Sequence, residues 1–233
     1  MAKTFLEAGN QVIICGRRES KLQEAKLKYP PLHIRVCDIE NKASRNDLFH
    51  WVTAEFPQVN MLVNNAGVQK EINFLAGATS ELEEESEIEI NLTACIHLCA
   101  LFVPHFLQQN TDCAILNVTS GLAFIPLKIV PVYCATKAGL RTFTISLRSQ
   151  LAKTKIRVFE IAPPIVQTEL HREAKARKQA NRGVAPDVVA EATLKAISRN
   201  KYEAIIGQAK TLKGASRLAP RFFHKLLNKL AAG

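Results

Sequence analysis

Tyr133 and Lys137 are the residues whose types and spacing most directly suggest chemistry in this sequence. A separation of four residues places both side chains on one face of a helix. A phenol has an ordinary pKa of about 10, too high for acid or base work at neutral pH, but a neighbouring ammonium favours the phenolate and lowers that pKa. The pair could therefore move a proton, although a solvated helix face would produce the same spacing.

Three further groups could complete such a site. Ser120 follows an expected strand, and a hydroxyl there can donate a hydrogen bond to a substrate carbonyl oxygen that the tyrosine protonates. Asn91 lies in an apolar helical segment, where a buried amide needs hydrogen-bond partners. The segment Asn64-Asn65-Ala66-Gly67 ends another expected strand, and its glycine allows close approach to the backbone.

Alternating extended and helical patterns must position these residues. Apolar runs predict strands at residues 12–15, 33–37, 60–64, 113–118, 156–161 and 203–206. Helical patterns cover residues 2–8, 21–28, 46–56, about 81–107, 132–153 and 186–198. This alternation indicates an α/β fold with a doubly wound parallel sheet covered on both faces. Ligands of such sheets bind beyond the carboxyl ends of the strands, where the polar residues above fall.

Together these residues resemble the short-chain dehydrogenase/reductase family over essentially the whole chain. The matching elements, in the family's order, are Asp38-Ile39, Asn64-Asn65-Ala66-Gly67, Asn91, Ser120, Tyr133, Lys137 and residues 163–168. Gly121-Leu122-Ala123-Phe124 and the Pro163-Pro164 pair are similar to the bacterial branch named after D-alanine lipoteichoic acid operons. That name describes a genomic context and not a substrate.

The resemblance implies a Rossmann-like oxidoreductase that transfers a hydride between a nicotinamide cofactor and a carbonyl or secondary alcohol. It implies that Tyr133 is the general acid/base and that Lys137 lowers its pKa and holds the nicotinamide ribose. Ser120 would orient the carbonyl, and Asn91 would hold a water molecule of the proton relay. No metal is implied.

The resemblance also assigns residues to the cofactor cleft. Asn64, Ala66 and Gly67 would line it, and Thr168 would contact the nicotinamide amide. Pro164 stands where the family commonly has glycine, which leaves the backbone contacts there open.

The segment after the first expected strand favours NADP(H) over NAD. NAD users place an acidic residue at the end of the second family strand, on the ribose 2′-hydroxyl. Arg17 and Arg18 stand there instead, and an arginine pairs well with a 2′-phosphate. Asp38 and Ile39 resemble the pair that contacts the adenine ring. A solvated arginine pair and a plain aspartate at a strand end are the alternatives.

The family begins with a strand and a Thr-Gly-x-x-x-Gly-x-Gly turn, and neither occurs in this sequence. Residues 2–8 already resemble the end of the helix that follows that turn, and the ten glycines include no such cluster. We therefore expect the sheet to lack its first strand, a central one, so that two strand edges are exposed. Two interpretations stay open: the natural product is longer, or the chain is a truncated, inactive dehydrogenase-like protein that acts through surfaces or oligomers.

Composition limits the classes of partner and compartment. The chain has 233 residues, 47% of them hydrophobic, which indicates one globular dinucleotide-binding domain over residues 1–233. Its net charge of +10 lies in residues 171–183 and 210–233, whereas nucleic-acid binders spread charge along a groove, so no nucleic-acid partner is expected. Six cysteines without a C-x-x-C pair, and no apolar leader, predict reduced thiols in a cytoplasmic protein.

Three segments have uses that the sequence leaves open. Residues 170–183 lie where the family carries its substrate lid, with a mobile basic loop as the alternative. The six glutamates of residues 81–89 are interpreted as a solvated helix face, with a surface for a basic partner as the alternative. The tail repeats cations beside Leu218, Phe222 and Leu226, with a break at Pro220. This amphipathic pattern favours packing on the body or on a second subunit of a homo-oligomer over peripheral membrane contact.

Overall fold

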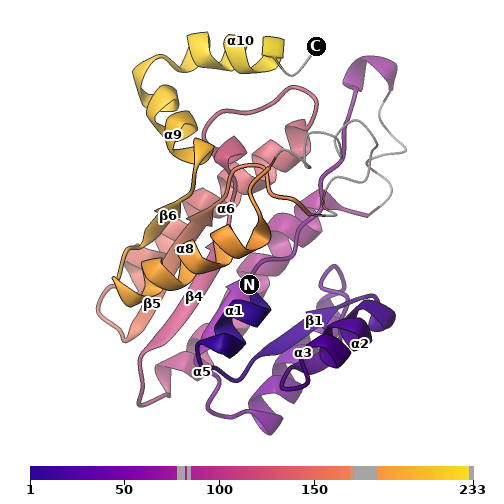
Figure 1. Ribbon diagram of the computed structural model, residues 1–233, viewed down its shortest axis with the longest axis vertical. Helices are drawn as coiled ribbons and strands as arrows, with labels where there is room; N and C mark the ends of the chain where they lie inside the picture. The colour runs from indigo at the N-terminus through magenta and orange to yellow at the C-terminus, as the bar shows by residue number, and fades with distance from the viewer. Residues whose placement is uncertain (78–81, 83–84, 169, 171–182, 231–233) are drawn as a thin grey trace.

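Six strands form two parallel sheets (Figure 1). The computed structural model describes residues 1–77, 82, 85–168, 170 and 183–230. The strands are β1 (Ile13–Gly16), β2 (His33–Val36), β3 (Met61–Asn64), β4 (Cys113–Val118), β5 (Ile156–Ala162) and β6 (Glu203–Ile205). One sheet has the order β1-β2 and the other β3-β4-β5-β6, and all four ladders are parallel. The expected α/β fold with a parallel sheet is confirmed.

Helices connect the strands, as parallel pairing requires. The α-helices are α1 (Ala2–Glu7), α2 (Glu19–Lys28), α3 (Lys42–Glu55), α5 (Ala94–Leu107), α6 (Pro131–Gln150), α8 (Pro186–Ser198), α9 (Gln208–Leu218) and α10 (Pro220–Leu230). Short turns of other helix types are η1 (Phe74–Ala76), the π-helical η2 (Glu89–Thr93) and η3 (Gly121–Ala123). The bounds of β4 and α8 coincide with those expected from the sequence. The other strands and helices for which the sequence predicts bounds agree within a few residues at their ends, apart from the helix expected from about residue 81.

Strand β4 separates two hydrophobic cores. All six of its residues are buried, and their side chains alternate between the faces of the sheet. Cys113 and Ile115 pack into a core with α3, α5 and α6, whereas Leu116 and Val118 pack into a second core with α1 and α8. A continuous apolar run is therefore what a strand with both faces covered requires.

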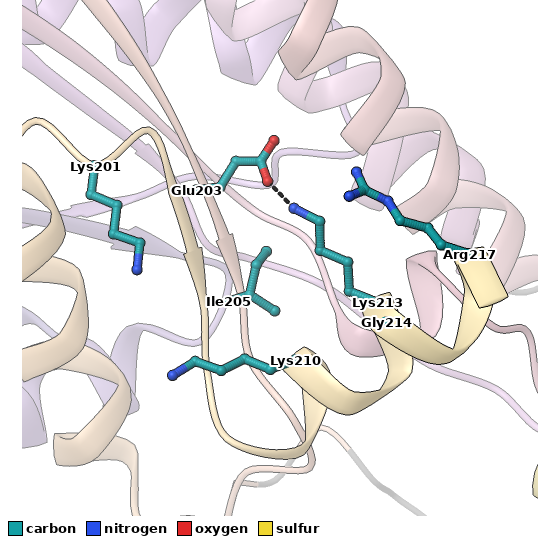
Figure 2. A pocket seen from close by; sticks show the side chains of 7 residues that line it. All are labelled: Lys201, Glu203, Ile205, Lys210, Lys213, Gly214 and Arg217. Carbon is teal, nitrogen blue, oxygen red and sulfur yellow. Dashed lines mark hydrogen bonds and ion pairs between the residues drawn. The ribbon is translucent and has the colours of Figure 1, made fainter.

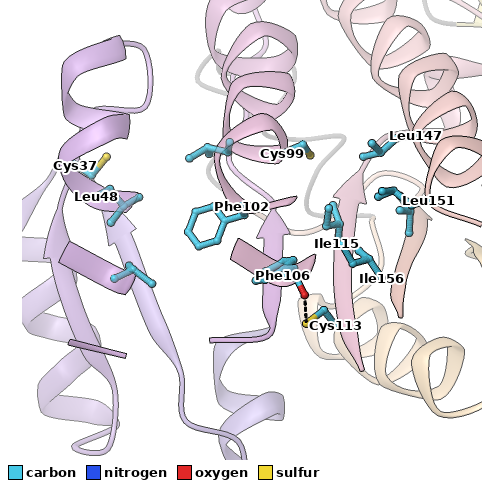
Figure 3. Close-up of a cluster of buried hydrophobic side chains, with 13 residues drawn as sticks. Cys37, Leu48, Cys99, Phe102, Phe106, Cys113, Ile115, Leu147, Leu151 and Ile156 are labelled. Atoms are coloured by element: carbon cyan, nitrogen blue, oxygen red, sulfur yellow. Dashed lines mark hydrogen bonds between the residues drawn. The ribbon is translucent and has the colours of Figure 1, made fainter. Parts of the chain in front are cut away.

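Helix α5 joins the two sheets through side-chain packing. Its Phe102 and Phe106 lie in one cluster with Cys37 and Leu48 from the β1–β2 side and with Ile115 from β4 (Figure 3). With the π-helical turn it spans residues 89–107, which by length (19 residues) and mean hydropathy (1.7) alone could cross a membrane. The burial of this helix in the cluster fits the expected core helix.

The two sheets are separate between β1 and β3. Among the described residues β1 pairs with β2 and β3 with β4, and no ladder joins β1 to β3. This is the position at which the sequence predicts a missing central strand. Figure 1 shows the β1–β2 unit with α2 and α3 to one side of the larger sheet.

The chain ends in two helices at one end of the molecule (Figure 1). Helix α9 packs on η3, where a Cβ at Gly121 would lie 3.1 Å from the Leu212 side chain and 3.2 Å from that of Ala209. Pro220 begins α10, since a proline is tolerated in the first turn of a helix but not in its interior. The tail is therefore two helices, as the break at Pro220 predicted.

Candidate active site

The parallel registers bring the predicted residues to one edge of the sheets. Gly16 pairs with Val36, so Arg17 and Asp38 follow neighbouring strands at the same end. Asn64 pairs with Asn117 in the larger sheet, which places Gly67 and Ser120 beyond neighbouring carboxyl ends as well. These four residues thus follow the carboxyl ends of their strands, which is where ligands of such folds bind.

Asn91 connects several segments at this end of the sheet by hydrogen bonds. It is fully buried in the π-helical turn, and its amide forms a reciprocal pair with the backbone of Val68: Nδ2 donates to the carbonyl oxygen at 2.8 Å, and Oδ1 accepts from N–H at 2.9 Å. Nδ2 also donates to the Thr136 hydroxyl at 3.2 Å. The amide therefore ties the segment after β3 to helix α6. π-Helical turns are often found at functional sites, and the sequence pattern does not predict this one.

Gly67 brings the segment after β3 against Asn91 and Lys137. A Cβ built on Gly67 would lie 3.2 Å from Asn91 Oδ1 and 3.5 Å from Lys137 Nζ. The missing side chain is therefore required for this contact, which fits the close approach expected from the sequence.

Lys137 is a buried cation whose ammonium points at the end of β4. Its Nζ donates to the carbonyl oxygen of Val118 at 2.8 Å and lies 5.8 Å from the centre of the Tyr133 ring. Burial lowers the pKa of Lys137, because an apolar environment disfavours the charged form. An ammonium has three N–H donors, and Val118 is its one hydrogen-bond acceptor among the described residues, so two donors remain for a ligand.

Tyr133 is buried beside Ser120, and its pKa corrects the sequence prediction. Burial raises the pKa of Tyr133 to about 12, while a hydrogen bond with the Ser120 hydroxyl opposes this rise. The sequence predicts that the Lys137 ammonium lowers this pKa. That prediction is wrong for this structure, because desolvation outweighs the ammonium, which is directed at the Val118 carbonyl.

The side chain of Asn64 is buried in the protein interior, against the neighbouring strand. Its Nδ2 donates to Asn117 Oδ1 at 2.8 Å, and Asn117 Nδ2 donates in turn to the Thr144 hydroxyl at 2.9 Å. The side chain of Asn64 thus links β3 to β4 and α6. This side chain is therefore occupied within the protein, and the expected lining of a cofactor cleft by Asn64, Ala66 and Gly67 stays a prediction.

The end of β1 carries a cation that already has a partner. The Arg17 guanidinium forms an ion pair with Glu85, and Arg18 precedes the first turn of α2. Asp38 Oδ1 accepts from the backbone N–H of Glu40 at 3.0 Å, which closes the turn that carries Ile39. The arginines and the Asp38-Ile39 pair therefore lie at one end of the β1–β2 sheet, as the sequence predicts.

Thr168 lies after β5 in an exposed turn, and its Oγ1 accepts from the backbone N–H of Leu170 at 3.4 Å. Among the described residues, no hydrogen bond joins Thr168 to Gly67, Asn91 or Lys137. The predicted lid over residues 170–183 lies outside the described residues except at its two ends.

In the described part of the acidic segment before η2, the glutamates have partners within the protein. Glu87 is buried, and its Oε1 accepts from the backbone N–H of Lys70 at 3.2 Å. Glu89 forms an ion pair with Arg45 at 2.9 Å, and Glu85 pairs with Arg17. A fully solvated face is therefore wrong for these three glutamates, since the sequence does not show their partners. Residues 81, 83 and 84 lie outside the described residues.

Sequence reasoning also missed Glu160. This fully buried carboxylate in β5 accepts from the Thr119 hydroxyl at 2.9 Å and lies 3.6 Å from the Arg141 guanidinium. Burial raises its pKa, and its Oε2 has no hydrogen-bond partner within the part of the chain that the structure describes. A lone charged residue in an apolar strand is the signal that could have identified it.

The described residues fit a nicotinamide cofactor at its nicotinamide ribose and at its adenosine phosphate. The two unused donors of Lys137 suit ribose hydroxyls, and the arginines after β1 suit an adenosine phosphate. The diphosphate is the exception, because the sequence has no glycine cluster to supply its backbone amides.

Comparisons with known proteins agree with this architecture. Residues 1–179 match the sequence model of the family described as short chain dehydrogenase. The "uncharacterized oxidoreductase DltE" of Bacillus subtilis strain 168 is 43% identical over 218 residues, which cover 93% of this chain and 86% of that protein.

Two solved structures show the same fold with different cofactors. The closed form of serine dehydrogenase complexed with NADP+ has a TM-score of 0.74 and 28% identity, over 83% of this chain and 81% of that one. The 3-ketoacyl-(acyl-carrier-protein) reductase of Brucella melitensis complexed with NADH has a TM-score of 0.75 and 27% identity, over 88% of this chain and 86% of that one.

Proposed function

This chain belongs to the short-chain dehydrogenase/reductase family, and from that premise we propose that it transfers a hydride between NADP(H) and a carbonyl or secondary alcohol. The observation that carries the proposal is the burial of Ser120, Tyr133, Lys137 and Asn91, the last two of which lie against Gly67. A solvated helix face, the alternative for the Tyr133–Lys137 spacing, does not bury a lysine.

The proposed roles follow from the protonation and donors of each group. A nicotinamide supplies the hydride when it is bound. Tyr133, protonated at neutral pH because its pKa is about 12, donates a proton to the carbonyl oxygen as that oxygen gains charge. The Ser120 hydroxyl hydrogen-bonds the same oxygen, and Lys137 holds ribose hydroxyls with its free donors. Asn91 keeps the backbone after β3 in place. The water molecule of the relay, which the family resemblance assigns to Asn91, would have to be held by an atom other than Nδ2, whose two hydrogens Val68 and Thr136 accept.

The NADP preference rests on charge. Two arginines follow β1 where an NAD user has a carboxylate, and a guanidinium pairs with phosphate through two parallel hydrogen bonds. The predictions of a single domain, a homo-oligomer and a cytoplasmic location stay predictions.

The proposal is tested with Tyr133→Phe, which removes the proton donor and keeps the ring. Reduction of ethyl acetoacetate is followed by NADPH oxidation with the full chain. Loss of the donor should lower turnover by ~10²–10⁴-fold with an unchanged thermal midpoint, because general acid catalysis contributes that much. Tyr29→Phe is the matched control and should keep full activity. Equal turnover of the Tyr133→Phe variant would overturn the assignment.

A second candidate is a dehydrogenase-like protein without catalysis. It is favoured by the separation of the described β1 and β3. It predicts that the wild-type chain oxidises no NADPH and that calorimetry detects no NADPH binding in the micromolar range.

A further inference from the structure

Helix α10 is attached to the protein through a buried amide on its polar face. The buried Asn228 accepts from the backbone N–H of Lys128 at 2.6 Å and donates to the Pro126 carbonyl oxygen at 3.2 Å. At about 100° per residue, Leu226 lies on the opposite side of the helix from Asn228. Leu226 is 41% exposed and Phe222, one turn before it, is 62% exposed. A helix that packs on its own protein buries its apolar face, and α10 presents part of that face to solvent.

Cations surround these apolar side chains. Residues 204–233 contain no aspartate or glutamate. Leu218, at the end of α9, is 85% exposed and precedes the break at Pro220. We call the following residues the C-terminal surface: Arg217, Leu218, Arg221, Phe222, Lys225, Leu226 and Lys229.

A basic pocket adjoins this surface through Arg217. A cavity of about 440 Å³ lies between β6 and α9, and Figure 2 shows Lys201, Lys210 and Arg217 around it. Lys213 is paired with Glu203 inside the pocket, so the other three cations leave it positively charged. The positive potential therefore extends from α10 along α9.

We propose that the C-terminal surface docks the protein on an anionic lipid bilayer. Apolar side chains flanked by lysine and arginine are the pattern of helices that lie in a membrane interface, with the charged groups at the headgroups. Each cation near an anionic membrane contributes about 1 kcal/mol, so the four cations of the surface suffice for reversible binding when the apolar side chains also insert.

Charge also argues against a second copy of this chain as the occupant. A symmetric pair would bring the same patch of both subunits together, and would oppose four cations to four cations. An anionic bilayer complements the charge, and its fluid surface fits a convex helix face without a preformed groove.

The test is co-sedimentation of the full chain with vesicles. We expect binding to vesicles of equimolar phosphatidylcholine and phosphatidylglycerol, little binding to phosphatidylcholine alone, and weaker binding as salt is raised. Arg221→Gln with Lys225→Gln should lower the affinity about thirtyfold, the equivalent of about 2 kcal/mol.

A second variant separates insertion from charge. Phe222→Ser with Leu226→Ser should also weaken sedimentation with anionic vesicles, because these side chains enter the acyl boundary. The matched control is Leu27→Ser with Lys28→Gln on α2, where Leu27 is 81% exposed, and it should bind as the wild type does.

Three results would overturn the proposal. The first is a lack of sedimentation with anionic vesicles at low salt. The second is binding that the α10 variants leave unchanged. The third is a lipid-free dimer, detected by analytical ultracentrifugation, that Phe222→Ser with Leu226→Ser converts to monomer without changing vesicle binding, which would make the surface an interface between subunits.

Discussion

The protonation of Tyr133 should make the stability of this protein depend on alkaline pH. Burial raises the pKa of Tyr133 to about 12, against about 10 for an exposed phenol. The folded state thus holds this proton more tightly than the unfolded chain. The resulting stabilisation is fully present below about pH 10 and is lost as the pH rises through about 12. Two pKa units correspond to about 3 kcal/mol in the free energy of unfolding.

The assay compares wild type with Tyr133→Phe by urea unfolding from neutral pH to pH 12. Phenylalanine keeps the ring and has no proton to lose, so the difference between the two pH profiles isolates this group. Wild type should lose about 2 kcal/mol more than the variant between about pH 10 and 12, and the remainder above that range. Parallel profiles would refute the reasoning. So would a phenolate absorbance of Tyr133 that develops below pH 10 in the folded protein, since it would show that the Lys137 ammonium outweighs burial.

Two further predictions concern the cofactor edge. Gly67→Ala places a Cβ 3.2 Å from Asn91 Oδ1 and should destabilise the protein by about 1–3 kcal/mol in urea unfolding. Gly214→Ala should not destabilise it, because no atom of the described residues lies within 4 Å of the added Cβ. Arg17→Ala with Arg18→Ala should raise the KM for NADPH about ten- to a hundredfold more than that for NADH, because a charge-assisted contact to phosphate contributes about 1.5–3 kcal/mol. Equal changes for both cofactors would show that the arginines do not recognise the 2′-phosphate.

The sequence predicts this fold well wherever one local rule decides the structure. The apolar run of β4 has both faces buried, and Pro186 starts α8 at a position where its missing N–H costs nothing, so both elements have their expected bounds. The polar residues at strand ends reach one edge because parallel strands share their direction. The order of the strands in the sheet then follows the usual rules for connections between parallel strands.

The rest depends on contacts between distant residues, which periodicity does not encode. Glu87 reaches the backbone of Lys70, and the Lys137 ammonium is directed at Val118, so neither burial nor the pKa of Tyr133 could be predicted from spacing. The orientation of α10 is a similar case. An amphipathic pattern shows that a helix has two faces, but a single buried amide, Asn228, decides which face meets the protein.

The separation between β1 and β3 has a consequence for how this molecule opens. A continuous hydrogen-bond ladder makes a sheet break cooperatively, whereas the described β1–β2 sheet is joined to the larger one by side-chain packing around α5. Such packing forms a weaker mechanical joint than a ladder, and units of this kind exchange their amide hydrogens through partial openings that leave the remainder folded. The arginines that would recognise the adenosine phosphate and the tyrosine that would move the proton lie on opposite sides of this joint. We therefore expect the first part of the cofactor site to open while the second stays folded.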